Sequence, residues 1–428
     1  MMLRTRNLRQ QLRRLDTTSK GDFTECLVLS AANPWEGIRM ADRQLAEALS
    51  QLIPVLYVEP ATSVVQRFRN EGWRGVRIRS RLHRESSSLA RLTPEGLPGL
   101  TWPGVRSINS KIVSWQVRRE IGRLRGSVRT TLEANILSPI MGTFGEVTKA
   151  YWAQDDFVGM APLLDLPSEP FARGESKLVD AADVIIAANP VVADTIRGRG
   201  RAVQLIPFGC DYPLFSSSAN VSPAADVDLP RPTALFMGHL GPRIDLNILE
   251  SFAQSGMSLL IVGPLPMKRD LRRFENILTK DNVSWLGERP FESLPSYLAH
   301  ADVGLLPYTR SKFNIGSCPL KVLEYLAAGL PVVATDLPAI RRLDTRHISI
   351  ENDPVRFVER VAELFEFGSD VAVDAERRRF AAEHSWAQCA SSFASALGLL
   401  PANASHDPQA GRSAVGRGPS SVSSSLQP

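Results

Sequence analysis

Residues 314–335 read NIGSCPLKVLEYLAAGLPVVAT, and this stretch constrains the fold more than any other part of the chain. The spacing of its apolar residues predicts one amphipathic helix, entered through Pro319, because a proline in the first helical turn loses no hydrogen bond. Ser317 is the expected N-cap, and Gly329 is the expected stop, since glycine accepts the left-handed conformation that ends many helices. The PVVAT that follows is typical of a short, buried parallel strand.

The N-terminus of this helix would project from the end of the preceding predicted strand, residues 303–308. Free backbone N–H groups and the positive end of the helix dipole suit a phosphate there. Lys321 adds a positive charge in the first turn, and Glu324 follows on about the same face. A cation for a diphosphate beside a carboxylate for a sugar diol is typical of a nucleotide-sugar site. The simplest alternative is an exposed ion pair on a core helix.

The ordered pattern Ser-x-Pro-Leu-Lys-x-x-Glu-Tyr-x-Ala-x-Gly-x-Pro-Val-Val resembles the C-terminal signature of bacterial glycosyltransferases with two Rossmann-like domains, the GT-B fold. It is most similar to the branch that builds exopolysaccharide and cell-wall polymers. The resemblance implies donor-binding residues in this stretch, namely Ser317, Pro319, Leu320, Lys321 and Glu324.

One position departs from the family pattern. Many relatives carry a glutamate that contacts the donor sugar eight residues before the equivalent of Glu324, and this chain has Gly316 there. The resemblance therefore carries over the diphosphate and ribose contacts more directly than the contact to the sugar.

Length and composition indicate two globular domains. A chain of 428 residues with 43% apolar content suits two domains, each with its own core. The cysteines are far apart and form no C-x-x-C pair, which argues against a metal cluster or disulfide framework and favours a reducing cytoplasm. No apolar run approaches the ~18 residues of a membrane span, and the N-terminus lacks the apolar segment of a signal peptide.

Charge is uneven along the chain. Residues 1–130 hold 23 Lys and Arg against 11 Asp and Glu, a net of +12, whereas the remainder holds 27 against 34, a net of −7. The asymmetry predicts an anionic partner for the N-terminal part: a membrane surface, a lipid-diphosphate acceptor or nucleic acid. Nucleic acid ranks last, because the sequence has no zinc-finger spacing, RNA-binding aromatic motif or basic zipper.

The N-terminal region opens with a predicted β-α-β unit, made of a strand at 26–31, a helix at 38–50 and a strand at 54–60. This opening also resembles the same glycosyltransferase branch. In its first loop, Gly37 would let the donor approach the backbone at the carboxyl edge of the sheet. Trp35 either contributes to that site or anchors the loop in the core.

A basic helix is predicted at residues 108–125, where an apolar stripe is opposed by a basic one. The apolar stripe contains Ile112, Val113, Val117, Ile121 and Leu124, and the basic stripe contains Lys111, Arg118, Arg119, Arg123 and Arg125. This helix is either an ordinary surface helix or a membrane-facing basic patch around the acceptor site.

Two aspartates are the candidate catalytic residues. Strands predicted near 134–140 and at 150–153 bring Asp155 and Asp156 to the functional edge of the sheet. A carboxylate there could take the proton of the acceptor hydroxyl, which an inverting enzyme needs and a retaining one does not. The alternative is a helix cap or a loop carboxylate.

The second domain opens with a strand at 233–238 and the loop HLGPR. Gly238 permits close backbone approach, and Arg243 can make a bidentate phosphate contact. This loop resembles the phosphate-binding loop of the family. The resemblance also implies donor contacts at Gly263 and at Arg289, the latter where relatives bind the base largely through backbone groups.

The predicted organisation is a basic arm (1–21), an N-terminal Rossmann-like acceptor domain (22–212), a linker (213–232), a C-terminal Rossmann-like nucleotide-sugar domain (233–370), a helix that crosses back to the N-terminal domain (371–400) and a disordered tail (401–428). The arm is either an interfacial helix or a solvated segment.

The fold class expected is α/β, with two Rossmann-like domains facing a cleft. The resemblance implies a hexosyltransferase that moves a sugar from a UDP- or GDP-linked donor to a hydroxyl acceptor, a lipid-linked or growing polysaccharide. It would need no metal or cofactor, because the helix dipole, Lys and Arg stabilise the leaving diphosphate. The expected location is the cytoplasm, peripherally on the inner face of the plasma membrane, with an anionic membrane surface as partner. Two alternatives remain: a sugar-nucleotide 2-epimerase and a non-catalytic nucleotide-sugar binding protein.

Overall fold

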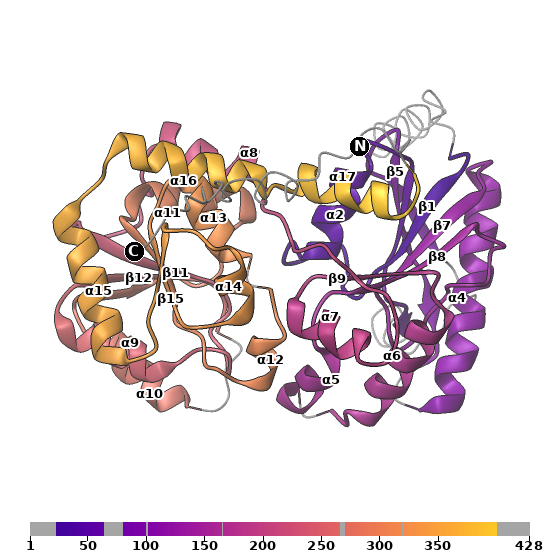
Figure 1. Cartoon of the computed structure of the whole chain (residues 1–428), viewed down its shortest axis with the longest axis horizontal. Helices are drawn as coiled ribbons and strands as arrows, with labels where there is room; N and C mark the ends of the chain where they lie inside the picture. The colour runs from indigo at the N-terminus through magenta and orange to yellow at the C-terminus, as the bar shows by residue number, and fades with distance from the viewer. Residues whose placement is uncertain are drawn as a thin grey trace, which may run out of the picture.

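The computed structural model describes residues 23–63, 80–99, 102–164, 166–265, 270–318 and 320–399. Two α/β domains lie side by side, each built around a mainly parallel sheet (Figure 1). This arrangement confirms the predicted fold class. The predictions for the basic arm, the C-terminal tail and Pro319 lie outside the described residues.

The first domain contains an eight-stranded sheet in the order β10-β9-β8-β7-β1-β2-β5-β4, parallel except for the β4–β5 pair. Its strands are β1 (Cys26–Ser30), β2 (Val55–Val58), β4 (Arg81–Arg84), β5 (Leu89–Thr93), β7 (Val128–Glu133), β8 (Thr148–Ala153), β9 (Val184–Ala187) and β10 (Gln204–Leu205). A two-stranded sheet, β3 (Thr62–Ser63) with β6 (Glu95–Gly96), lies beside it. The central strands are apolar along their whole length because both faces of the sheet are covered.

Helices cover the two faces of this sheet. They are α2 (Ala41–Leu49), α4 (Pro103–Arg123), α5 (Phe157–Met160), α6 (Glu169–Ala181) and α7 (Pro190–Arg197), with a 3₁₀ turn at Ala161–Leu164. The α4 helix buries Val113, Val117 and Ile121 against the face that carries Cys26 and Val28. The predicted apolar stripe of this helix is thus confirmed at its central positions.

The second domain contains a six-stranded parallel sheet in the order β13-β12-β11-β14-β15-β16. Its strands are β11 (Thr233–Met237), β12 (Ser258–Val262), β13 (Val283–Trp285), β14 (Val303–Leu306), β15 (Val332–Ala334) and β16 (Ile348–Ile350). Its helices are α8 (Tyr212–Ser216), α9 (Leu246–Ser255), α10 (Leu271–Leu278), α11 (Leu294–His300), α12 (Lys312–Ile315), α13 (Lys321–Ala328), α14 (Pro338–Arg342), α15 (Pro354–Phe367) and α16 (Val371–Glu383), with 3₁₀ turns at Ser217–Asn220 and Phe291–Ser293.

The predicted crossing helix is two helices. Helix α16 packs on α13 in the second domain, and α17 (Trp386–Ala396) packs on α2 in the first. Figure 1 shows them end to end along the top of the molecule. The break falls at His384 and Ser385, because the Ser385 side chain caps α17 by accepting the Gln388 backbone N–H.

The two connections between the domains run beside each other. The Cys210 backbone N–H donates to the His384 carbonyl oxygen, and the Trp386 N–H donates to the Cys210 carbonyl oxygen, both at 3.0 Å. A Cβ on Gly209 would lie 2.5 Å from the Ser385 backbone, so the close approach requires glycine at this position. This pairing fixes where the chain leaves and re-enters the first domain.

Two other sequence predictions were wrong in detail. The strand expected near 134–140 ends earlier, as β7, and these residues form a loop whose backbone N–H groups donate to the buried Glu133 carboxylate. The linker expected at 213–232 is not structureless at its start, because Phe215 of α8 is fully buried in the second-domain core.

Phe393→Ala tests whether α17 is part of the first-domain core. The Phe393 ring is fully buried and lies 5.2 Å from the Trp152 ring in an edge-to-face arrangement. The substitution should lower the free energy of unfolding by about 3–5 kcal/mol, measured by urea titration. Phe367→Ala is the control, because that ring is 82% exposed; equal effects of the two substitutions would contradict this account.

Candidate active site

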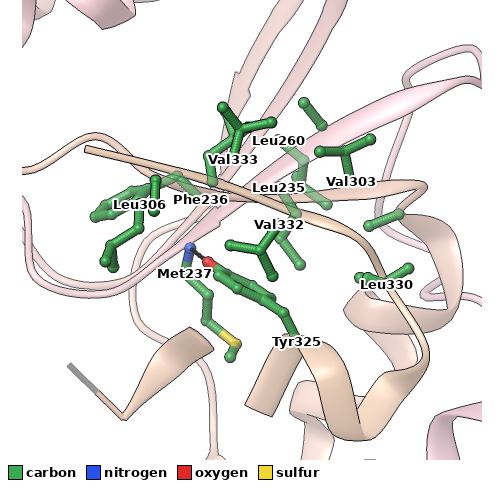
Figure 2. Close-up of a cluster of buried hydrophobic side chains, with 14 of the residues drawn as sticks. Leu235, Phe236, Met237, Leu260, Val303, Leu306, Tyr325, Leu330, Val332 and Val333 are labelled. Carbon is green, nitrogen blue, oxygen red and sulfur yellow. Dashed lines mark hydrogen bonds between the residues drawn. The ribbon is translucent and has the colours of Figure 1, made fainter. Parts of the chain in front are cut away.

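Tyr325 fixes the direction of α13. Its ring packs on β14, where a Cβ added to Gly304 would lie 2.3 Å from the ring, and its hydroxyl accepts the Met237 backbone N–H at 2.8 Å (Figure 2). Gly329 ends the helix in the left-handed conformation, as predicted. Because α13 follows a parallel strand, its N-terminal end lies at the carboxyl edge of the sheet, the usual edge for ligands in such folds.

The N-terminal end of α13 is not capped by Ser317. The helix begins at Lys321, and no side chain caps it at Leu320. Ser317 Oγ instead accepts a hydrogen bond from Arg243 Nη2 at 2.9 Å. The predicted cap was wrong because the charged guanidinium is a stronger donor than a backbone N–H. The first N–H groups of α13 therefore have no side-chain cap.

Arg243 is held by contacts on several sides. Its Nε donates to Asn314 Oδ1 at 2.8 Å, and the guanidinium carbon lies 4.8 Å from the Tyr308 ring centre and 4.7 Å from that of Phe313. Asn314 is fully buried and also donates to the Arg243 carbonyl oxygen at 3.0 Å. The positive charge therefore has one defined position beside the N-terminal end of α13.

Two glycines allow the ends of β11 and β12 to lie close to Lys321 and to each other. A Cβ on Gly238 would lie 2.7 Å from Lys321 Cε, and a Cβ on Gly263 would lie 1.9 Å from the Gly238 carbonyl oxygen. Both glycines have positive φ, 156° and 145° respectively. The Lys321 side chain thus crosses directly over the loop after β11, and this close contact requires glycine at position 238.

His239 joins this basic group. Burial, followed by the nearby positive charge of Lys321, lowers the pKa of the His239 ring, and Arg243 lowers it further. Glu324 follows Lys321 by three residues on α13 and is only 5% exposed. Burial raises the pKa of the Glu324 carboxyl, the Lys321 charge opposes this effect, and Asp211 adds to it.

The first domain contacts the segment before α13 through Asn189. Its Nδ2 donates to the carbonyl oxygens of Ser317 at 2.6 Å and Ile315 at 3.3 Å, and its Oδ1 accepts the Val191 N–H to cap α7. Asn189 is fully buried. One side chain thus joins the N-terminal end of α7 in the first domain to the loop before α13 in the second.

Asp156 lies against Gly316 across the same interface. A Cβ on Gly316 would come 2.8 Å from Asp156 Cβ, which leaves no room for a side chain at this position. The Asp156 carboxylate caps α5 by accepting the Gly159 N–H at 2.8 Å. The helix-cap alternative is therefore realised for Asp156, and the departure of Gly316 from the family pattern has a steric cause.

Asp155 faces the basic group of the second domain. Burial raises the pKa of its carboxyl to about 7, the Arg243 charge opposes that rise, and Asp156 adds to it. Near neutral pH the group can therefore both accept and release a proton, as a general base requires.

The other predicted residues are placed differently. Gly37 has a positive φ of 93° in an exposed loop, and the neighbouring Trp35 is buried against Tyr57, so the loop-anchoring alternative fits Trp35. The Arg289 guanidinium donates hydrogen bonds to Tyr297 Oη and to the Asp226 carboxylate. These two partners hold the Arg289 side chain against the linker. Leu320 packs against the first-domain core. Roles in donor binding for these residues stay predictions.

Sequence reasoning missed Asn189, Asn314 and His239. His239 has a local signal, since it follows Gly238 directly in the predicted phosphate loop. The two asparagines have none, because their partners are distant along the chain or in the other domain.

The family model described as Glycosyl transferases group 1 matches residues 231–366, which include all the predicted donor-site residues of the second domain. The structure also resembles solved GT-B proteins over most of its length. The sucrose-phosphate synthase of Thermosynechococcus elongatus has a TM-score of 0.64 at 18% identity, covering 87% of this chain and 98% of that one. Residues 231–366 thus match the group 1 glycosyl transferases, and the chain has the GT-B fold.

Two further similar proteins are informative. TuaH of Bacillus subtilis, named as a glycosyltransferase of teichuronic acid biosynthesis, is 27% identical over 223 residues, which is 50% of this chain and 56% of TuaH. The match thus spans about half the length of that relative. HepE of Anabaena, solved with UDP and glucose, has a TM-score of 0.59 at 13% identity, covering 88% of this chain and 100% of HepE.

None of the described helices combines the length and apolar character needed to cross a membrane. No group of three or more His, Cys, Asp or Glu in the same part of the chain is arranged to hold a metal ion.

Asp155→Asn tests the burial of this carboxyl. Its pKa is raised from the ordinary 3.8 to about 7, so the folded state loses stability as pH rises from about 4 to about 7 and stays at the lower level above. The gain in the free energy of unfolding that Asn brings should therefore be about 1–3 kcal/mol larger at pH 8 than at pH 5. Thermal melts of both proteins at the two pH values measure this. A gain that is independent of pH, or a loss at pH 8, would contradict it.

Proposed function

We propose that this chain is a glycosyltransferase that moves a sugar from a nucleotide-diphosphate sugar to a hydroxyl acceptor. The observation that carries the proposal is the convergence of Lys321, Arg243 and His239 on the uncapped N-terminal end of α13. The two cations Lys321 and Arg243, together with free backbone N–H groups, match the charge of a diphosphate, and the neutral His239 ring can donate a further hydrogen bond. The match of residues 231–366 to the group 1 glycosyl transferases supports the same chemistry.

In this proposal the donor lies along the carboxyl edge of the second sheet. Lys321 and Arg243 hold the diphosphate, with the Gly238 and Gly263 backbones against it, and Glu324 accepts from the ribose hydroxyls. These groups stabilise the leaving nucleotide as its negative charge develops, so transfer would proceed without a metal. Ser317 acts indirectly here, because its hydroxyl orients Arg243.

Asp155 is the better candidate for a base in an inverting reaction. Its pKa of about 7 suits proton transfer near neutrality. Asp156 is already used as the cap of α5. A retaining reaction would leave Asp155 as an electrostatic partner of Arg243, so inversion predicts a much larger loss of turnover on its removal.

The proposed donor is UDP- or GDP-linked, and the proposed acceptor is a lipid-linked or growing polysaccharide. Solved neighbours support a UDP donor: HepE was solved with UDP and glucose, and an E. coli neighbour with UDP-2-fluoro glucose. The name of TuaH supports a cell-wall polymer. The net charge of +12 over residues 1–130 supports work at an anionic membrane, on the inner face of the plasma membrane.

Lys321→Ala should remove most of the affinity for the nucleotide. Loss of one charge-assisted contact costs about 1.5–3 kcal/mol, or roughly 10- to 100-fold in Kd. Isothermal titration with UDP and with GDP measures this. Lys280→Ala is the matched control, because Lys280 is an exposed lysine of the same domain in the turn before β13. Unchanged nucleotide affinity in Lys321→Ala would contradict the site.

Turnover separates the proposed transfer from the alternatives. Release of UDP or GDP that depends on an added polysaccharide acceptor supports a transferase. An epimerised donor without release supports an epimerase, and tight binding without either product supports a binding protein.

A further inference from the structure

The outer face of α4 carries large apolar side chains in contact with solvent. Trp115 is 53% exposed and Ile108 is 48% exposed, and Trp102, directly before the helix, is 67% exposed. Figure 1 shows α4 on the outer side of the first domain, away from the second domain. The inner face of the same helix is already buried against the sheet through Val113 and Val117. Helix α4 is therefore apolar on two faces, and only one of them is accounted for by the fold.

Positive charge surrounds the exposed apolar residues. The helix contains five basic residues, namely Arg106, Lys111, Arg118, Arg119 and Arg123. Its one acidic residue, Glu120, is buried and accepts from Arg123 and from Ser80. The face seen by a partner is thus basic and aromatic, with no exposed carboxylate from α4.

This composition matches one kind of partner better than others. Tryptophan side chains have an apolar body and a polar N–H, and they favour the boundary between water and lipid. Lys and Arg around them attract anionic headgroups. Trp115 also lies under the Arg119 guanidinium, whose carbon is 5.8 Å from the ring centre, so the pair presents both features together.

We propose that α4 docks on an anionic lipid bilayer through Trp102, Ile108 and Trp115, with Lys111 and Arg119 contacting the headgroups. The inference deepens the proposed work at a membrane and rests on it. It also gives the docking a direction. Helix α4 begins after β5 and β6, at the carboxyl edge of the first sheet, and Asp155 follows β8 at the same edge. The N-terminal end of α4 therefore lies at the edge of the sheet that carries Asp155, and a bilayer along the rest of the helix lies on the side of the first domain away from the second (Figure 1).

The experiment uses the full chain with vesicles of phosphatidylglycerol and of phosphatidylcholine. Wild type should co-sediment with the anionic vesicles at low salt, should not with neutral ones, and should be released by ~0.5 M NaCl. Trp102→Ala/Trp115→Ala and, separately, Lys111→Glu/Arg119→Glu should each weaken binding by ~10-fold or more. The matched control is Phe367→Ala/Val371→Ala, which removes two side chains of the second domain that are each 82% exposed. It should bind as wild type does.

A second measurement tests the contact in variants that still bind the vesicles. In a Trp73→Phe background, vesicles that contain brominated lipid should quench tryptophan fluorescence, because Trp102 and Trp115 enter the lipid boundary. Trp35, Trp152 and Trp386 are buried, and Trp285 is half-buried in the second domain. Trp102→Phe/Trp115→Phe should still bind but lose most of this quenching. Circular dichroism melts confirm that each variant is folded.

The outcomes separate this inference from the broader proposal. Wild-type binding that survives unchanged in the folded α4 variants, or quenching that survives in the Phe variant, would overturn α4 as the docking face while leaving the membrane proposal intact. Absence of wild-type binding at low salt would overturn both, and titration with UDP on the same sample would show whether donor binding stands without them. Equal capture by DNA and by anionic vesicles would contradict a lipid-specific face.

Discussion

The packing of Tyr325 against Gly304 is the contact on which the position of α13, and hence of the basic group at its N-terminal end, depends. The ring fits only because residue 304 has no side chain, and its hydroxyl takes up the Met237 N–H at the end of β11 (Figure 2). This single side chain ties α13 to two neighbouring strands. With α13 so fixed, Lys321 must cross the Gly238 loop, and Gly238 must in turn contact Gly263. The geometry of the basic group thus follows from close contacts at glycines rather than from flexible surface side chains.

The second constraint is the interface between the domains. Asn189 donates to the Ser317 carbonyl, and Asp156 fills the space beside Gly316. The loop that orients Arg243 is therefore held by both domains at once. A glutamate at position 316 would not fit in this arrangement, because Asp156 of the first domain occupies the space beside Gly316. The position of the Arg243 guanidinium and the packing of the two domains therefore depend on the same loop.

Local patterns in the sequence predicted the parts of the fold that depend on local physics. The apolar spacing of α13, the stop at Gly329 and the buried strands were all predicted, because periodicity and glycine conformation are properties of short segments. The loop after β7 was mistaken for a strand, since the carboxylate that organises it, Glu133, is buried by tertiary packing. The break before α17 was missed although its cause, the Ser385 cap, is local.

The site was predicted less completely than the fold. Lys321 and Arg243 were predicted as phosphate contacts because each lies in a local pattern, the start of a helix and a glycine-rich turn. The hydrogen bond from Arg243 to the Ser317 hydroxyl was not predicted, because Arg243 is far from Ser317 in the sequence. The Ser317 hydroxyl accepts from this guanidinium and not from a backbone N–H of α13. Asn189 could not be found at all, because its function as a contact exists only when the two domains meet.

The central claim is that a nucleotide diphosphate binds the N-terminal end of α13 and the loop after β11. Hydrogen–deuterium exchange with saturating UDP, and in parallel GDP, tests it most directly, because bound phosphate oxygens protect the backbone N–H groups that they contact. The account predicts slower exchange in peptides that cover residues 237–243 and 320–324 with at least one of the two nucleotides. Protection confined to the first domain, or no change in either peptide at saturation, would contradict it.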